Sequence, residues 1–398
     1  MLPYGRQTIT EDDIAAVAAV LRSDFLTQGP LVAEFERRFA ARVGARHAVA
    51  VCNATAALHL AMRLAELGPG DRVVTSPITF VASANAAAYA GATPDFADID
   101  PVSYTLDPRA LEATWRDDTR AVVAVDFAGQ ASDLPEIARI ARARGALVIE
   151  DACHAVGGRF HDDRQPSRAW NVGGNPWADL AVFSFHPVKT LTTGEGGMLV
   201  TDNAGWADQA RRLRSHGIER DPARFTEFAG ETGPWMHEMQ ELGYNYRLTD
   251  LQCALGLSQL DRLDAALARR REIVAAYNSA FAGIDWMTPP GLRTASDAPT
   301  TSWHLYVTQI DFDALGRSRS EVIATLRAAG VGTQVHYIPV HLQPWYRRTF
   351  GYAPGKCPHA ESFYGRALSL PLFPGMTDAD VRQVTDAVGS LAGQPASV

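Results

Sequence analysis

At 398 residues the chain is long enough to form two domains that share a large core. Its apolar fraction of 46%, charged fraction of 21% and net charge of −8 are typical of a globular protein and argue against a nucleic-acid partner. The four cysteines form no C-x-x-C pair and no stretch resembles a signal peptide or a membrane span, which predicts a cytoplasmic protein with free thiols and no membrane partner.

The first half of the chain predicts alternating helices and strands. A helix should begin after Thr10, which can cap it with Asp13 at the third helical position, and a second helix, 33–44, should end at Gly44. Beyond it short apolar strands alternate with helices, which favours an α/β fold with a mostly parallel sheet covered on both faces. The seven predicted strands are 48–52, 72–76, 93–99, 121–127, 146–151, 179–185 and 196–201.

The pattern changes after a long helical stretch, 255–281. We therefore expect a large domain over 1–255, and a linking helix with a smaller C-terminal α+β domain over 256–398. The polar segment 161–178, rich in Gly and Pro, is predicted to be an inserted loop. The remaining predicted elements are strands at 304–310 and 333–339 and helices at 320–330 and 377–393.

The carboxyl ends of parallel strands form the usual ligand site of an open sheet. After the strand 48–52 come Asn53, Ala54 and Thr55 at a helix start, where free N–H groups suit a phosphate, although simple capping explains the same residues equally well. Phe80 follows the next strand, and its ring could either stack on a ligand or pack in the core.

Two further strands end in groups that can do chemistry. Asp151 closes the strand 146–151, and a buried carboxylate there could pair with a cationic ring nitrogen, with His154 or with an arginine. Ser184 and Lys189 follow the apolar run 179–185. A lysine held against apolar neighbours is partly neutral and can form a Schiff base, whereas the alternative is a solvated surface lysine. A phosphorylated pyridine aldehyde would use the lysine, the aspartate and the helix start together.

Signatures of other chemistries are missing from the sequence. There is no G-x-G-x-x-G after the first strand, no phosphate-binding G-x-x-x-x-G-K-[ST], no H-E-x-x-H and no G-x-S-x-G. His336 and His341 could suggest a metal pair, but no third ligand is near them in the sequence, so an active-site or packing role is favoured and no metal is expected.

Together these stretches resemble the sugar-nucleotide aminotransferases of the DegT/StrS type, which are pyridoxal-phosphate enzymes of fold type I. The most specific part is FSFHPVK followed by TTGEGG. The resemblance implies pyridoxal 5′-phosphate as cofactor, with Lys189 bonded to its aldehyde, Asp151 at its ring nitrogen and Phe80 stacked on its ring. The other matching stretches are LTQGP (26–30), NATAALHLA (53–61), PITFVASANA (77–86), EDACHAVGG (150–158), GYNYRLTDLQCALGLSQL (243–260) and VHYIPVH (335–341).

The resemblance also assigns the remaining cofactor contacts by position. Ala54, Thr55 and Ser184 match phosphate contacts, and His154 falls near the ring hydroxyl, where many relatives have glutamine. Asn245 in GYNYR matches an asparagine that reaches the phosphate bound by the neighbouring subunit. That match implies a homodimer with shared active sites.

A finer resemblance is to the aminotransferases of the pseudaminic acid pathway, which aminate C4 of a UDP-linked 4-keto-6-deoxy-N-acetylhexosamine, typically with L-glutamate. Two alternatives stay open: a transaminase acting on another nucleotide-linked keto sugar, and a regulatory protein that binds the cofactor without turnover. Sugar dehydratases of the same fold usually carry histidine at the position of Lys189, which argues against them. The UDP-sugar contacts implied by the resemblance are Tyr4, Leu26, Thr27, Gln28, Val335, His336 and Tyr337.

Overall fold

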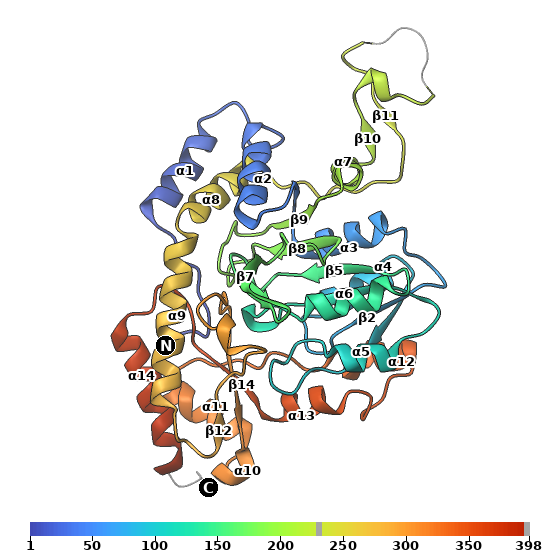
Figure 1. Ribbon diagram of the computed structural model, residues 1–398. Coiled ribbons are helices and arrows are strands. Elements are labelled where there is room, and N and C mark those ends of the chain that lie inside the picture. Colours follow the sequence, from blue (N-terminus) through green and yellow to red (C-terminus); the bar gives the residue numbers. More distant parts are fainter. Residues whose placement is uncertain (228–232, 394–398) are drawn as a thin grey trace.

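The computed structural model describes residues 1–227 and 233–393 (Figure 1). In Figure 1 a sheet flanked by helices occupies the middle of the molecule, and a second group of helices and short strands lies below it. The last five residues of the predicted C-terminal domain, 394–398, lie outside the described part.

The central sheet has seven strands in the order β1-β9-β8-β5-β4-β2-β3. Neighbours from β8 to β3 pair in parallel, and β9 is antiparallel to both β1 and β8. Each strand lies where the sequence predicted one, so the mostly parallel seven-stranded sheet is confirmed. The strands are β1 (His47–Val51), β2 (Arg72–Thr75), β3 (Thr93–Phe96), β4 (Thr119–Val125), β5 (Leu147–Asp151), β8 (Leu180–Ser184) and β9 (Gly197–Thr201).

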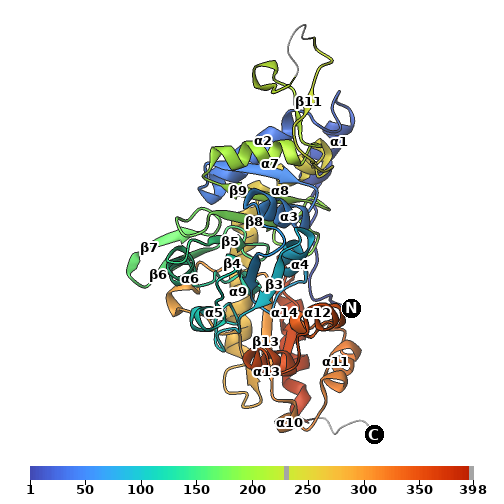
Figure 2. The same cartoon turned by 90° about the vertical axis from the view of Figure 1, so that its right-hand side faces the viewer.

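Helices cover both faces of this sheet because successive strand residues point to opposite sides. On β4, Val122 and Ala124 belong to one apolar cluster, whereas Val123 and Val125 belong to another. Figure 2 shows α3 and α4 on one side of the sheet and α6 on the other. The helices of this part are α1 (Glu11–Leu21), α2 (Pro30–Val43), α3 (Ala54–Leu64), α4 (Ala82–Tyr89), α5 (Pro108–Thr114), α6 (Leu134–Arg142) and α7 (Ala204–Leu213).

The predicted helix ends are confirmed by their local geometry. The Thr10 N–H donates to the Asp13 carboxylate at 2.9 Å at the start of α1. Gly44 follows α2 with φ of 83°, a left-handed conformation that glycine adopts without a steric penalty.

The helical stretch predicted over 255–281 is two helices, α8 (Asp250–Asp261) and α9 (Leu263–Ala280), with a break at Arg262. The Arg262 guanidinium forms an ion pair with buried Asp13. The break lets α8 pack against α1 and α2, while α9 runs down to the lower part of the molecule (Figure 1).

The lower part is built on a three-stranded antiparallel sheet and a separate apolar cluster. Leu2 pairs with Val331, so the first residues of the chain join this part. The division at residue 255 stays a prediction. The elements are β12 (Met287–Thr288), β13 (Tyr306–Ile310), β14 (Ala367–Leu370), α10 (Phe312–Leu315), α11 (Arg319–Ala328), α12 (Pro344–Phe350), α13 (Pro358–Arg366) and α14 (Asp378–Gly389). Short 3-10 helices are η1 (Phe127–Gly129), η2 (Pro222–Arg224), η3 (Ala295–Asp297), η4 (Val340–Leu342) and η5 (Ser390–Gly393).

Two predictions of local structure are wrong. The segment 161–178 was expected to be a loop, but β6 (Arg159–Asp162) and β7 (Gln165–Asn171) pair as an antiparallel hairpin, with Phe160 buried against the large core. The segment 333–339 was expected to be a strand, but only Gln334 pairs with β14, because its neighbours Val335, His336 and Tyr337 line a cavity instead.

A narrow arm leaves the body beyond α7. It carries the short strands β10 (Ile218–Glu219) and β11 (Glu238–Met239), and it projects at the top of Figure 1. Trp235, Met239 and Leu242 on this arm expose large apolar side chains. Among the described helices, none combines the length and the apolarity needed to cross a lipid bilayer.

Candidate active site

A cavity of about 580 Å³ opens where β1, β4, β5 and β8 end. Strands of one direction deliver their carboxyl ends to the same edge of the sheet, which is why side chains from distant parts of the sequence meet there. The predicted site residues that line this cavity are Tyr4, Ala54, Thr55, Phe80, Asp151, His154, Ser184, Lys189, Val335, His336 and Tyr337.

Lys189 lies partly buried in this cavity rather than on a solvated face. The backbone N–H of Lys189 donates to the carbonyl of His186 at 2.9 Å, in the turn that follows β8. Burial lowers the pKa of the Lys189 ammonium, and nearby Cys153 and Asp151 oppose that change. A lysine whose neutral form is favoured can act as a nucleophile.

Asp151 ends β5 and is 5% exposed. Its carboxylate accepts hydrogen bonds from the Ser83 hydroxyl at 2.6 Å and from the Cys153 N–H at 3.2 Å, and Thr79 lies 2.7 Å from Ser83. Among the described residues neither His154 nor an arginine forms an ion pair with Asp151. Neutral donors therefore hold this carboxylate while leaving its charge available to a ligand.

A second pair of carboxyl groups lies behind Asp151. Asp126 and Glu150 are fully buried and close enough for their charges to interact, and Asp126 Oδ2 and Glu150 Oε1 have no hydrogen-bond partner among the described residues. The other Glu150 oxygen, Oε2, accepts from the Gly173 N–H at 3.0 Å and from the Asn175 amide at 2.8 Å. Burial raises the pKa of Asp126 well above its usual value and that of Glu150 to about 7, so the pair tends to retain a proton near neutral pH.

The start of α3 is shaped to take a phosphate. Asn53 caps the helix by accepting from the Ala56 N–H at 2.8 Å, which leaves the N–H groups of Ala54 and Thr55 without an acceptor among the described residues. Gly197 pairs with Val51 and Ser184, and a Cβ on it would lie 2.6 Å from the Ala54 nitrogen. Capping by Asn53 therefore leaves N–H groups available for an anion, and the surroundings fit the phosphate of pyridoxal phosphate.

His154 and Phe80 form the wall beside Tyr337. The Ala128 N–H donates to His154 Nδ1 at 3.3 Å, and burial keeps the pKa of His154 well below its usual value. The neutral ring therefore carries its proton on Nε2, which lies 3.3 Å from the Tyr337 hydroxyl. Phe80 is 59% exposed and lines the cavity, so its packing in the core is excluded.

His336 and His341 have different partners. His336 Nδ1 lies 2.8 Å from the Ser369 hydroxyl, and its ring packs against Tyr4. His341 Nε2 lies 2.9 Å from the Glu361 carboxylate, away from the cavity lining. Within the described residues no cluster of side chains has the composition of a metal site.

Four predicted site residues do not line the cavity of their own chain: Leu26, Thr27, Gln28 and Asn245. All four are exposed. Thr27 pairs with Thr249, and Asn245 pairs with Ser215 at the base of the arm. Gln28 borders a separate hollow whose lining includes Arg211, Arg212, Arg220, Arg224 and Arg247.

Several cavity residues were missed by the sequence analysis. Ser83 stands out as a polar residue in the alanine-rich start of α4, a signal that could have been used. Cys153 lies inside the matching stretch EDACHAVGG. His304 was assigned to a strand, but β13 begins only at Tyr306, because the N–H groups of His304 and Leu305 donate to the Ala128 carbonyl instead.

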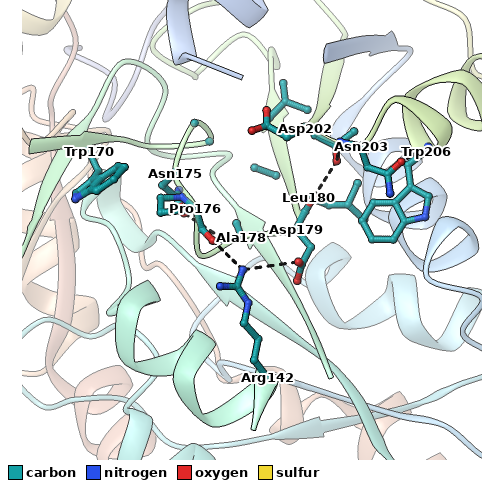
Figure 3. A pocket seen from close by; sticks show the side chains of 15 residues that line it. Arg142, Trp170, Asn175, Pro176, Ala178, Asp179, Leu180, Asp202, Asn203 and Trp206 are labelled. Carbon is teal, nitrogen blue, oxygen red and sulfur yellow. Dashed lines mark hydrogen bonds and ion pairs between the residues drawn. The ribbon is translucent and has the colours of Figure 1, made fainter. Parts of the chain in front are cut away.

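A second hollow, of about 570 Å³, lies where β8 begins (Figure 3). In Figure 3 Arg142 points to Asp179 and to the segment of Pro176, while Trp206 lies on the far side. Arg142 donates to the carbonyl of Pro176 at 2.8 Å and pairs with Asp179 at 3.8 Å. Arg142 and Asp179, which line this hollow, are thus engaged in contacts that stabilise the fold. None of the predicted site residues lines the hollow.

Comparisons with known proteins point to one family. A family model for the DegT/DnrJ/EryC1/StrS aminotransferase family matches residues 7–389. The spore coat polysaccharide biosynthesis protein SpsC of Bacillus subtilis (strain 168) is 44% identical over 390 residues, which cover 97% of this chain and 96% of SpsC.

Solved structures of the same kind superpose on the whole chain. Helicobacter pylori PseC, an aminotransferase involved in the biosynthesis of pseudoaminic acid, matches with a TM-score of 0.87 at 29% identity, over 98% of this chain and 99% of PseC. The PLP-form of the putative sugar aminotransferase Spr1654 from Streptococcus pneumoniae matches with a TM-score of 0.85 at 30% identity, over 98% of both chains.

Proposed function

The chain belongs to the DegT/DnrJ/EryC1/StrS aminotransferase family, and from that premise we propose that it transfers the amino group of L-glutamate to C4 of a UDP-linked 4-keto-6-deoxy-N-acetylhexosamine. The coarser statement follows from the family and the fold: the protein is a pyridoxal-phosphate-dependent sugar aminotransferase. The observation that carries the proposal is the meeting of Lys189, Asp151 and the start of α3 in one cavity.

The residues present fit the cofactor. When bound, pyridoxal phosphate supplies an aldehyde and an electron-withdrawing pyridine ring. Asp151 would keep the ring nitrogen protonated, and Ala54, Thr55 and Ser184 would bind the phosphate. Lys189 would hold the cofactor through its aldehyde group.

Protein groups also handle the protons of the reaction. With the cofactor bound, the Lys189 amine would remove the proton from the amino-bearing carbon of the donor and would later return a proton to the sugar carbon. His154, whose Nε2 lies 3.3 Å from the Tyr337 hydroxyl, would donate a hydrogen bond to the cofactor ring, and Phe80 would pack against that ring and exclude water.

Support for the sugar comes from likeness to particular relatives. The similarity to PseC favours the pseudaminic acid precursor. The higher identity to SpsC, 44% against 29%, favours a second candidate, a different nucleotide-linked keto sugar destined for a polysaccharide. Tyr4, Val335, His336 and Tyr337 line the cavity and are the proposed contacts to the sugar in either case.

The test is direct amination of defined substrates. Purified protein is incubated with L-glutamate and, separately, with UDP-linked and dTDP-linked 4-keto-6-deoxy sugars, and products are read by mass. The proposal expects the UDP-linked N-acetylhexosamine to gain an amino group fastest, and the Lys189→Ala chain to form none. Faster amination of another nucleotide sugar would establish the second candidate instead.

We also propose a homodimer in which each site is completed by the partner. Leu26, Thr27, Gln28 and Asn245 are exposed and lie outside their own cavity, as expected of residues that act on a neighbouring chain. The exposed apolar side chains of the arm, Trp235, Met239 and Leu242, also favour contact between the arm and a second chain. A cytoplasmic location remains the expectation drawn from the sequence.

A further inference from the structure

The cavity residue His304 has not yet been given a role, and its side chain has no hydrogen-bond partner among the described residues. His304 is 4% exposed, lines the cavity and packs against His154 with ring centroids 4.5 Å apart. Its Nδ1 is buried, and among the described residues its side chain forms no hydrogen bond. Buried polar groups are nearly always paired, so an unpaired imidazole in a cavity is suited to a ligand.

The backbone around His304 is held tightly to the loop that carries His154. The His304 N–H donates to the Ala128 carbonyl at 2.9 Å, and the Ser302 hydroxyl donates to the His154 carbonyl at 2.8 Å. Trp303 has φ of 50°, a conformation that a bulky residue rarely adopts. Such a backbone persists only where its surroundings impose it, which is common at binding sites.

A buried arginine supports the same segment. Arg270 is 1% exposed, and it donates to the carbonyls of Trp303 at 3.2 Å, His304 at 3.2 Å and Leu372 at 2.9 Å. Within the described residues it has no carboxylate partner. Burial lowers the pKa of Arg270 to about 10, so it remains charged at neutral pH. An uncompensated buried cation behind His304 makes this part of the cavity favourable for an anion.

The cavity itself offers few cations to an anionic substrate. Among its described lining residues Lys189 is the only lysine, and there is no arginine. Burial, with Lys189 and Arg270 nearby, keeps the pKa of His304 well below its usual value, so its ring is neutral and carries one N–H. Every α-amino acid donor brings an α-carboxylate next to the reacting carbon, whereas a sugar hydroxyl carries no charge and gains little from Arg270.

We propose that His304 donates a hydrogen bond to the α-carboxylate of the amino donor, and that Arg270 is a positioning residue that holds His304 in place and makes its surroundings positive. The inference rests on the proposed transaminase function. It concerns the donor and does not depend on which sugar accepts the amino group.

The test follows the donor step alone, with cofactor-loaded protein and no sugar. The conversion of cofactor absorbance is recorded in single turnovers with L-glutamate and with 4-aminobutyrate, which lacks only the α-carboxylate. His304→Leu, of similar volume, should lower the rate constant per donor concentration by roughly 10- to 100-fold for L-glutamate, the range of a hydrogen bond to a charged group. The reaction with 4-aminobutyrate should change less than about threefold.

Two matched variants accompany it. His304→Gln keeps an N–H donor and should recover most of the L-glutamate rate. His359→Gln, on the exposed surface of α13, should leave both donors unchanged. Equal losses on both donors in His304→Leu, or no loss on L-glutamate, would overturn the proposal.

Arg270 is tested by the ratio of the two donor rates, which a general loss of structure would not change. Arg270→Gln removes the charge and keeps donor groups, so the preference for L-glutamate over 4-aminobutyrate should fall. Arg270→Lys keeps the charge and should retain the preference. Unchanged ratios in both variants would remove Arg270 from the proposal.

The failure of this inference is distinct from the failure of the proposed function. Wild-type protein that reacts with L-glutamate but aminates no nucleotide sugar would overturn the proposed acceptor and leave His304 to be judged by its own variants. If L-glutamine or L-alanine reacts faster than L-glutamate, the same comparison is made with that donor, since all three share the α-carboxylate. Wild-type protein that reacts with none of them overturns both.

Discussion

Lys189 is proposed both to attach the cofactor covalently and to transfer protons, and these two tasks can be measured apart. The chain contains only one other lysine, Lys356, which forms an ion pair with Asp95 at 2.8 Å. Lys189→Ala should still retain cofactor through the start of α3 and Ser184, but turnover should be lost. After borohydride reduction, mass spectrometry of wild-type protein should find the phosphopyridoxyl group on Lys189.

The second lysine supplies the control for that labelling. Lys356→Ala should be labelled on Lys189 like the wild type, because Lys356 lies outside the cavity lining. A label on Lys356, or wild-type protein that is saturated with cofactor and takes no label, would refute the assignment of Lys189.

The buried carboxyl pair predicts a pH dependence of stability. Folding raises the pKa of Asp126 and raises that of Glu150 from 4.5 to about 7. As the pH rises, these two carboxyl groups therefore lose their protons at a lower pH in the unfolded chain than in the folded chain. Their contribution to the free energy of unfolding is complete below the pKa of the unfolded carboxyl groups and is lost as the pH passes about 7.

Glu150→Gln isolates this effect, because its amide can accept from Gly173 and donate to Asp126 but cannot ionise. The fall in the free energy of unfolding between about pH 5 and pH 8 should be smaller than in the wild type by about 1–3 kcal/mol. Urea titrations at a series of pH values measure it, with Glu66→Gln on the exposed surface as control. Parallel pH curves for the wild type and Glu150→Gln would contradict a proton retained by the pair.

At the scale of elements, the start of α3 and the strand β9 approach closely at the proposed phosphate site. Gly197→Ala places a Cβ 2.6 Å from the Ala54 nitrogen, so one of the two elements has to move. The affinity for pyridoxal phosphate should fall roughly 10-fold or more, as expected when a hydrogen bond to a charged group is lost. Fluorescence titration of cofactor-free protein measures it, and Gly365→Ala, with open space around the added Cβ, should bind normally.

Element predictions succeeded where local pattern decides structure. The strands of the large sheet are short apolar runs between caps and turns, and all seven were predicted. The prediction of a strand at 333–339 failed because the consecutive residues Val335, His336 and Tyr337 line the cavity, a tertiary role that the local pattern does not reveal. The hairpin of β6 and β7 was missed because the segment 161–178 is polar and contains Gly and Pro like a loop, while the burial of Phe160 is a tertiary contact.

At the scale of the whole molecule, the proposed shared sites predict complementation between two inactive chains. One chain carries Lys189→Ala and the other carries Asn245→Trp, whose bulk should block the phosphate of the partner. Random mixing should restore about a quarter of the wild-type sites, because half of the dimers are mixed and each has one intact site. Turnover after joint refolding measures it, and size-exclusion chromatography checks that dimers form.

Each chain refolded alone is the control and should stay inactive. Mixed dimers without activity would mean that Asn245 serves only its own turn beside Ser215. The single substitution Asn245→Ala should weaken cofactor retention by about 1–3 kcal/mol if the cross-subunit contact exists.

The sequence by itself was enough to predict the succession of helices and strands along the chain and a mostly parallel sheet, and to single out Lys189 and Asp151, because both follow from local rules. Caps, hydrophobic period and glycine mark the elements, and residues at the carboxyl ends of parallel strands must share one edge of the sheet. Only the tertiary structure brought His304 beside His154, placed Ser83 on Asp151 and paired Asp126 with Glu150. Each of these contacts joins residues that are far apart in the chain or lie on different elements. They depend on how side chains pack in three dimensions, and no local sequence pattern predicts that packing.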